Sequence, residues 1–260
     1  MVEVSSPKHR IVKEYRLLGK SRNRKKGGKV ILEGSHLLRE ALTAGIEIEA
    51  ILYTEAFLAA PGNSELLAGA EGSYHYLISE SIFNEIAQTE SPQGVGVIAR
   101  IPSCTSEFLW KRDDPFLIVL DRIQDPGNLG TIIRTAAAAA VDGVLLLSGT
   151  ADPTNPKALR AGMGGTFYLP LLHESELPHW PKLFAQQGIR LIAADPRGDT
   201  PYHAVDYSGA VALIIGNESR GVSRPLLERA DVRAFIPLMG EISSLNAAVA
   251  AALFIFERQK

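Results

Sequence analysis

The second half of the chain consists of short apolar runs separated by helix-forming segments, and this alternation restricts the fold more than any other feature. From residue 116 onward the runs are FLIVL, GVLLL, FYLPLL, RLIAA, AVALII and VRAFI. Strands that are apolar at nearly every position belong to parallel sheets that helices cover on both faces. The segments between the runs, such as LGTIIRTAAAAA and SRPLLERA, are typical of those helices. The pattern therefore predicts an α/β domain with a parallel sheet over residues 116–260.

A smaller alternation of strands and helices comes first. Strands are expected at KVILEG, EAILYT and YHYLI, and a strand pair around SPQGVGVIARI, with helices at SHLLREALTAG and ESIFNEIAQ. Residues 102–115 contain Pro, Ser, Thr and a KRDD cluster, which is typical of a linker. The sequence therefore predicts a small α/β unit with a basic arm over residues 1–101, a linker over 102–115 and the parallel-sheet domain over 116–260.

The N-terminal arm is strongly basic, although the whole chain has a net charge of −2. Residues 1–29 contain ten Lys or Arg and two Glu, so they carry +8 and the remainder carries −10. We expect a helix near Pro7 to Leu18 within this arm. A basic segment on an acidic protein is the electrostatic signature of a polyanion ligand, and nucleic acid is the leading candidate. A solvated charged face with no ligand is the alternative interpretation.

Composition argues against several other classes of protein. The chain is 22% charged and has no segment typical of a membrane span, and its first residues, MVEVSSPKHR, lack the apolar centre of a signal peptide. We therefore expect a cytoplasmic protein. The one cysteine, Cys104, cannot form an internal disulfide, and we expect it to be structural rather than nucleophilic. No spacing of Cys and His predicts a metal site.

Polar loops follow three of the predicted strands of the second domain. LDRIQDPGNLGTIIRT places Asn128 at a predicted helix N-cap and Arg134 well inside that helix. ALIIGNESRGVSRP places Asn217 and Glu218 directly after a strand, and IPLMGEISSLN is the third loop. Ligands of open parallel sheets bind at the carboxyl ends of the strands, so three such loops at one edge predict a binding site. Each loop by itself also fits ordinary turn chemistry.

The last helix of the chain is the most apolar one. From Leu245 to Phe256 its only polar side chain is Asn246. We expect Ser243 and Ser244 to cap this helix, and Asn246 to be buried with a partner for its amide. A helix that is apolar on every side must be covered on every side, and a run of 12 residues is shorter than the roughly 20 that span a membrane. It is therefore either a core helix or a dimer-interface helix with its first turn in a site.

Together the three loops resemble the motifs of the SpoU (TrmH) family of RNA ribose 2′-O-methyltransferases, within the knotted SPOUT superfamily. The first motif, Asn-x-Gly-x-x-x-Arg, is matched by Asn128, Gly130 and Arg134. The second motif, a strand followed by Gly-Asn-Glu and a later Gly, is matched by Gly216, Asn217, Glu218 and Gly221. The third motif, Ile-Pro-x-x-Gly followed by Ser-Leu-Asn, is matched by Ile236, Pro237, Gly240, Ser244, Leu245 and Asn246. Residues 1–101 are similar to the small RNA-binding domain that often precedes this family's catalytic domain.

This resemblance implies a Rossmann-like domain with a C-terminal trefoil knot and S-adenosylmethionine as methyl donor, held largely by backbone groups. It assigns cofactor binding to four residues: Gly216, Asn217, Ile236 and Leu245. It assigns the catalytic site to five residues: Arg134, Asn128, Glu218, Ser244 and Asn246. Two departures from the family pattern are Ser243, where an acidic residue is common, and Ala248, where serine is frequent.

The role of Arg134 is open at this point. Accounts of the family make this arginine the proton acceptor, but a guanidinium with a pKa above about 12 stays protonated. We prefer a role in holding RNA phosphate and stabilising the developing alkoxide, and a salt bridge to Glu218 is the structural alternative. For Asn128 the alternative is a plain helix cap, and for Ser244 and Asn246 it is capping or amide pairing.

The favoured prediction is a homodimeric enzyme, paired through the C-terminal helix, that methylates a ribose 2′-hydroxyl in RNA, with ribosomal RNA as the preferred substrate. Transfer RNA is a second candidate substrate. A non-catalytic RNA-binding protein on the same scaffold is the alternative from another class. The presence of Arg134, Glu218, Ser244 and Asn246 favours the enzyme, because a scaffold has no reason to retain all four.

Overall fold

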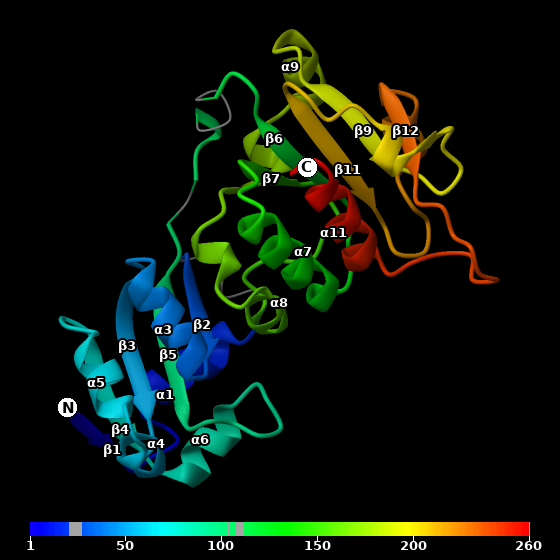
Figure 1. The fold of residues 1–260 in the computed structure, drawn as a ribbon. Coiled ribbons are helices and arrows are strands. Elements are labelled where there is room, and N and C mark those ends of the chain that lie inside the picture. Colours follow the sequence, from blue (N-terminus) through cyan, green and yellow to red (C-terminus); the bar gives the residue numbers. More distant parts are fainter. Residues whose placement is uncertain (21–27, 103, 108–111, 260) are drawn as a thin grey trace. The chain divides into compact units, whose positions relative to one another are not determined.

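The computed structural model describes residues 1–20, 28–102, 104–107 and 112–259, and its internal contacts divide the chain into two units (Figure 1). The N-terminal unit consists of Met1–Ser103 and Thr154–Phe167. The C-terminal unit consists of Cys104–Pro153 and Tyr168–Lys260. Each unit has its own sheet and its own hydrophobic core.

The N-terminal unit contains a five-stranded sheet in the order β1-β4-β3-β5-β2. Its strands are β1 (Val2–Val4), β2 (Lys29–Glu33), β3 (Glu47–Tyr53), β4 (Tyr74–Ile78) and β5 (Val95–Arg100). Its helices are α1 (Arg10–Leu18), α3 (Ser35–Thr43), α4 (Glu55–Ala59), α5 (Asn63–Ala68), α6 (Glu80–Ile86) and α8 (Pro156–Gly162). The predicted strand pair near residue 95 is a single strand, β5, which pairs antiparallel with both β2 and β3. That prediction was wrong because the turn around Gly94 precedes the strand instead of dividing it.

The basic arm is largely part of the N-terminal core. β1 pairs with β4, and α1 buries Ile11, Val12, Tyr15 and Leu18 against β2 and α6. Arg10 and Lys13 of α1 are exposed, and Arg16 forms an ion pair with Glu85 of α6 at 2.9 Å. Four further cations of the arm lie outside the described residues: Arg22, Arg24, Lys25 and Lys26.

The segment Thr154–Phe167 joins the N-terminal unit although it follows the first strands of the other sheet in the sequence. Leu159 of α8 is 1% exposed and belongs to the core cluster of β2, α3 and β5. Arg160 of the same helix donates to the Gln88 carbonyl at 3.4 Å. We predicted residues 116–260 as one continuous domain, and that prediction did not include the assignment of residues 154–167 to the N-terminal unit.

The C-terminal unit contains a seven-stranded sheet, all parallel, in the order β10-β12-β9-β11-β6-β7-β8. Its strands are β6 (Phe116–Asp121), β7 (Gly143–Leu146), β8 (Leu171–His173), β9 (Arg190–Ala194), β10 (Thr200–Pro201), β11 (Val211–Gly216) and β12 (Val232–Phe235). Its helices are α7 (Pro126–Ala138), α9 (Trp180–Gln186), α10 (Arg224–Leu227) and α11 (Ala247–Glu257).

Helices cover both faces of this sheet, as the apolar runs predict. Alternate residues of β6 point to opposite faces: Ile118 and Leu120 belong to the cluster with α7 and α11, and Leu117 and Val119 to the cluster with α9 and α10. α7 and α11 lie side by side on one face (Figure 1). No helix in the described part of the chain is long and apolar enough to cross a membrane.

Candidate active site

A cavity of about 390 Å³ opens at the carboxyl edge of the parallel sheet in the C-terminal unit. The loops after β9, β11 and β12 and the start of α11 line it. Its lining contains all four residues assigned to the cofactor: Gly216, Asn217, Ile236 and Leu245. Ser244 and Glu218 line it as well. We call this space the C-terminal cavity.

A tight loop follows β11 and forms one wall of the C-terminal cavity. The backbones of Asn217 and Gly221 pair with each other at 3.1 and 2.8 Å, and the Asn217 Oδ1 accepts from the amides of Ser219 and Arg220 at 3.1 Å. At Gly216 a Cβ atom would lie 2.1 Å from the Val222 nitrogen, so only glycine fits there. The second sequence motif is therefore a requirement of this loop's geometry.

Glu218 ties this loop to the beginning of α7. Its carboxylate accepts from the backbone amides of Gln124 and Asp125 at 3.3 and 3.2 Å and from the Asn128 Nδ2 at 3.1 Å. Partial burial by itself would raise the pKa of Glu218, but the hydrogen bonds from Asn128 and from backbone amides outweigh it and hold the pKa below its ordinary value. Glu218 is therefore a charged acceptor in neutral solution.

Asn128 is not the N-cap of α7, so that prediction was wrong. The cap is Asp125, whose carboxylate accepts from the Asn128 amide at 2.9 Å while Pro126 occupies the first helical position. Aspartate before proline satisfies the first turn better than an asparagine three residues later. The Asn128 side chain is thereby left to bond other loops.

Asn246 is the N-cap of α11, and it is exposed instead of buried. Its Oδ1 accepts from the amides of Ala248 and Val249 at 2.9 and 3.3 Å, and its Nδ2 donates to the Asn128 Oδ1 at 2.9 Å. The predicted cap by Ser243 and Ser244 and the predicted helix start at Leu245 were therefore wrong. The helix begins at Ala247, and Ser243 and Ser244 are exposed in the loop that precedes it.

Arg134 lies six residues after Asn128 on α7 and is exposed. The salt bridge to Glu218 that we considered is absent among the described residues, because the Glu218 carboxylate bonds to the start of α7 instead. The Arg134 guanidinium is therefore available to a ligand.

Sequence reasoning missed a buried polar group beneath the site. Asp121 ends β6 at 3% exposure, and its carboxylate accepts from the Arg122 Nε at 2.9 Å and from the Ser223 amide at 2.6 Å. Arg122 has a φ of 61°, a conformation that costs a non-glycine residue about 1 to 2 kcal/mol. The signal in the sequence was an aspartate at the end of the otherwise apolar run FLIVLD.

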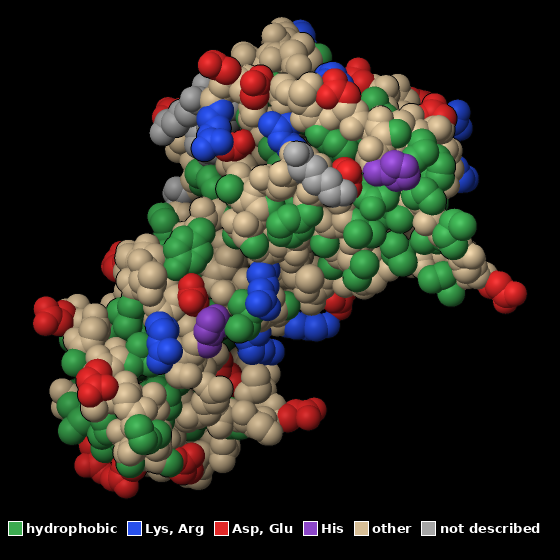
Figure 2. Space-filling view, viewed as in Figure 1, with side chains coloured by type: hydrophobic (Ala, Val, Ile, Leu, Met, Phe, Trp, Pro, Cys, Tyr) green, Lys and Arg blue, Asp and Glu red, His purple; other side chains and the backbone are tan. Residues whose placement is uncertain are grey.

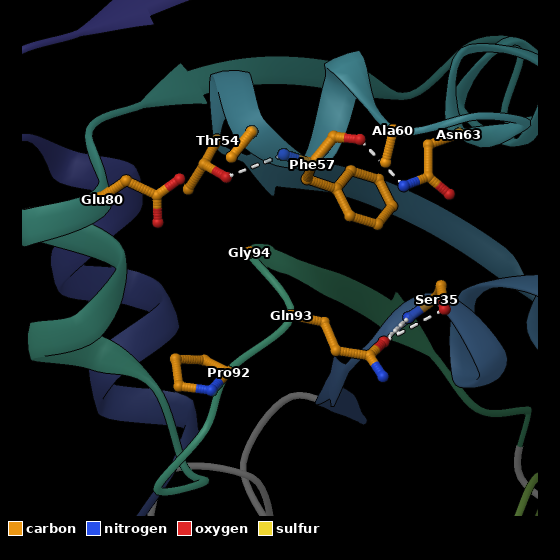
Figure 3. A pocket seen from close by; sticks show the side chains of 10 residues that line it. Ser35, Thr54, Phe57, Ala60, Asn63, Glu80, Pro92, Gln93 and Gly94 are labelled. Atoms are coloured by element: carbon orange, nitrogen blue, oxygen red, sulfur yellow. Dashed lines mark hydrogen bonds between the residues drawn. The ribbon is translucent and has the colours of Figure 1, made fainter.

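The N-terminal unit has a second, polar cavity of about 310 Å³ at the ends of β2 and β3 (Figure 3). The Gln93 Oε1 accepts from the amide and hydroxyl of Ser35 at 2.9 and 3.1 Å, and the Asn63 Nδ2 donates to the Phe57 carbonyl at 2.8 Å. Among the described residues that line it there is no Lys or Arg. Hydroxyl and amide groups therefore dominate this cavity, and it lacks the cations of a phosphate site.

Comparison with known proteins agrees with this geometry. A family model described as the SpoU rRNA Methylase family matches residues 115–256, and one described as an MRM3-like substrate binding domain matches residues 9–97. The 23S rRNA (guanosine(2553)-2′-O)-methyltransferase RlmP of Bacillus subtilis is 35% identical over 98% of both chains. The 23S rRNA (uridine(2479)-2′-O)-methyltransferase of Streptomyces viridochromogenes is 28% identical over 93% of this chain and 86% of that one.

Solved structures resemble the whole chain as well. The AdoMet-bound rRNA methyltransferase from Sinorhizobium meliloti has a TM-score of 0.84 at 31% identity, covering 99% of this chain and 97% of its own. The SpoU methyltransferase AviRb from Streptomyces viridochromogenes, in complex with AdoMet, has a TM-score of 0.86 at 26% identity, covering 96% and 97%. The three motif loops, the parallel sheet and these matches agree, and the chain belongs to the SpoU rRNA methylase family.

Proposed function

We propose that the chain transfers a methyl group from S-adenosylmethionine to a ribose 2′-hydroxyl of RNA, with ribosomal RNA as its substrate. The observation that carries this proposal is the hydrogen-bonded series from Asn246 through Asn128 to Glu218. It joins one side chain from each of the three motif loops, and Glu218, at one end of the series, lines the C-terminal cavity. The relatives named for 23S rRNA support the class of substrate.

The C-terminal cavity fits S-adenosylmethionine in its size and in the chemistry of its lining. Small-molecule sites usually measure about 300 to 1,000 Å³ and combine apolar walls with a few polar groups. Here Ile236, Leu245 and Phe254 supply apolar surface, and the loop from Gly216 to Gly221 supplies backbone groups. When bound, the cofactor supplies a methyl group activated by the sulfonium. We assign its binding to Gly216, Asn217, Ile236 and Leu245.

Arg134 is the residue that we assign to the reacting hydroxyl and its phosphate. Methyl transfer is an in-line displacement, and aligning the reactants contributes up to about 7 to 11 kcal/mol to such reactions. An exposed guanidinium retains its proton and offers a planar fork of donors, which suits an RNA phosphate and a developing alkoxide. Arg134 therefore acts as an electrostatic anchor in this proposal.

The remaining four polar residues hold the site in shape and orient the ribose. Glu218 and Asn128 fix the β11 loop to the first turn of α7, where they orient ribose hydroxyls. Asn246 aligns the start of α11 with the same turn. Ser244 lines the cavity with an exposed side chain and contacts cofactor or substrate.

The enzyme works as a homodimer through α11. Val249, Leu253 and Phe256 are 50%, 37% and 48% exposed, and their spacing places them along one stripe of the helix. Hydrophobic side chains gather, among other surface, in the region of α11 in the space-filling view (Figure 2). Because α7 and α11 cover the same face of the sheet, Arg134 lies on that face too, which supports a site completed by the second copy.

The N-terminal unit binds the RNA and the protein acts in the cytoplasm, where ribosomes are assembled. The unit carries the basic arm, and phosphate contacts position an RNA without reading its sequence. The match to a substrate-binding family model over residues 9–97 supports this division of work. We expect the trefoil knot of the superfamily in the C-terminal unit.

The decisive experiment maps ribose methylation in ribosomal and transfer RNA from cells with and without the gene. We expect one ribosomal ribose to lose its methyl group in the deletion strain and to regain it with the intact gene but not with Arg134→Ala. If a methyl group is lost from transfer RNA instead, transfer RNA is the substrate. Unchanged methylation in every RNA would favour the non-catalytic scaffold.

A further inference from the structure

Thr150 lies in the loop after β7 and forms hydrogen bonds on both sides of its hydroxyl. Its Oγ1 donates to the Leu120 carbonyl at 2.9 Å and accepts from the Arg122 amide at 3.1 Å. The side chain therefore spans the last residues of β6 and the residue that follows the strand. The next residue, Ala151, donates its amide to the Ile123 carbonyl at 2.8 Å, so the two loops run together.

Arg122 is the residue that this contact holds. Its φ of 61° lies in the left-handed region, which a side chain larger than glycine adopts only where neighbours enforce it. Gly149, which precedes Thr150 in the same loop, lies so close to the Arg122 side chain that a Cβ there would lie 3.0 Å from the Arg122 Cγ. The hydrogen bond from the Arg122 amide to the Thr150 Oγ1 is the polar contact through which this loop holds the Arg122 backbone.

The conformation of Arg122 directs its carbonyl to Asn217, which lines the C-terminal cavity. The Asn217 Nδ2 donates to the Arg122 carbonyl at 2.8 Å, and it reaches its other acceptor, Glu218, only at 3.4 Å. The Asn217 Oδ1 shapes the loop that forms the cavity wall. The orientation of the Asn217 amide, and with it the loop, therefore depends on where the Arg122 carbonyl points.

We propose that Thr150 is a positioning residue for methyl transfer: its hydroxyl fixes the Arg122 backbone, whose carbonyl orients Asn217 and the cofactor-binding loop. This inference rests on the proposed function, because the loop that Thr150 would position through Arg122 is the one assigned there to S-adenosylmethionine. Thr150 itself touches neither cofactor nor substrate in this assignment. No motif of the sequence includes Thr150, because it lies between β7 and α8.

The test compares Thr150→Val, which removes the hydroxyl and keeps the shape, with Thr150→Ser, which keeps the hydroxyl. Calorimetry measures S-adenosylmethionine affinity, single-turnover assays measure methyl transfer to ribosomal RNA, and a melting curve measures stability. We expect the valine variant to lose about tenfold in cofactor affinity, the usual effect of one hydrogen bond, and the serine variant to recover it. If valine prevents folding, Thr150→Ala replaces it.

Thr54→Val is the matched control, because the Thr54 hydroxyl accepts from the Phe57 amide in the N-terminal unit. We expect it to lower the melting temperature and leave cofactor affinity unchanged. Asn217→Asp removes the donor to the Arg122 carbonyl. If Thr150 acts through this contact, the double variant with Thr150→Val should lose no more cofactor affinity than the single variant with the larger loss. If Thr150→Val binds S-adenosylmethionine with wild-type affinity, the inference about Thr150 is wrong, and the proposed function is unaffected. Wild-type protein that binds no S-adenosylmethionine would overturn the proposed function as well.

Discussion

The Asn246 Nδ2 donates a hydrogen bond of 2.9 Å to the Asn128 Oδ1, across 118 residues of sequence. Each side-chain amide also forms other hydrogen bonds: Asn246 caps α11, and Asn128 donates to Glu218 at 3.1 Å. An asparagine offers both a donor and an acceptor, whereas a carboxylate offers only acceptors. Both positions therefore require the amide, and this pair sets the position of the α11 N-terminus relative to α7.

Asn128→Asp should lower the single-turnover rate of methyl transfer by about tenfold or more. The substitution removes the donor to Glu218 and places two carboxylates side by side, which raises the pKa of Glu218 and pushes the β11 loop from α7. Asn63→Asp is the matched control, since its amide donates to a backbone carbonyl in the N-terminal unit. Equal rates for the wild type and Asn128→Asp would show that the pair is dispensable.

The lowered pKa of Glu218 predicts how stability depends on pH. Its ordinary value is about 4.3, so between that value and the lower folded value the unfolded chain binds more protons than the folded one. The stabilisation is therefore fully present above about pH 4.3 and is lost as the pH falls through the folded pKa. Melting curves of the wild type and Glu218→Gln should differ by a constant amount at neutral pH and converge in acid. A difference that is the same at every pH would contradict this assignment.

The sequence predicted the two α/β units and the three loops because those features follow from patterns within single elements. The apolar runs of β6 and β11 are buried on both faces, as their composition requires. Gly216 and Gly221 belong to a loop whose geometry needs glycine, so the residue types themselves carried the signal.

The caps and partners were not predictable in the same way. Both Asp125 and Asn128 are residue types that cap helices, and so are Ser244 and Asn246. Which residue of each pair is the N-cap depends on the other hydrogen bonds that the side chains form in the folded protein. The helix with Leu159 has an apolar face, but that face does not say which of two sheets it covers. The hydrogen bond that the Arg122 amide donates to the Thr150 Oγ1 joins residues 28 apart, and no local pattern indicates it.

Lysine in place of Val249 and Leu253 should dissociate the proposed dimer and weaken cofactor binding together. The charges would enter the proposed apolar interface at two adjacent positions of the exposed α11 stripe, where burying an unpaired ammonium is strongly unfavourable. Sedimentation gives the mass and calorimetry the cofactor affinity. Leu17→Lys on α1 is the control, because Leu17 is 51% exposed on the N-terminal unit. A wild-type protein that is monomeric at full activity would refute the dimer.

Replacing the cations at Arg22, Arg24, Lys25 and Lys26 with serine should flatten the salt dependence of RNA binding. Each lost phosphate contact reduces the slope of log K against log salt by about 0.7 to 0.9. Deleting residues 1–29 is not an equivalent test, since α1 is part of the core. Arg16→Gln is the control, because that cation is paired with Glu85. Equal slopes with and without the four charges would show that they face only solvent.

Substitutions of Arg134 distinguish three roles for this residue: proton acceptor, electrostatic anchor or structural partner. The structural role predicts that Arg134→Ala and Arg134→Lys both lose thermal stability, with activity following the folded fraction. The exposed side chain has no bond to Glu218 in the structure, so we expect both variants to melt as the wild type does. Both should keep the oligomeric state of the wild type and bind S-adenosylmethionine.

Catalysis then separates the two chemical roles of Arg134. A point charge partly replaces an anchor but lacks the planar fork, so Arg134→Lys should retain a fraction of the single-turnover rate and Arg134→Ala almost none. A proton acceptor predicts instead a rate for the lysine variant that rises as the ammonium deprotonates, near pH 10.4 for an ordinary lysine. The anchor predicts a lysine rate without that rise, because the charge itself carries the effect. Wild-type turnover by a well-folded Arg134→Ala protein would remove this residue from the mechanism and leave alignment by Asn128, Glu218 and Asn246 to account for the rate.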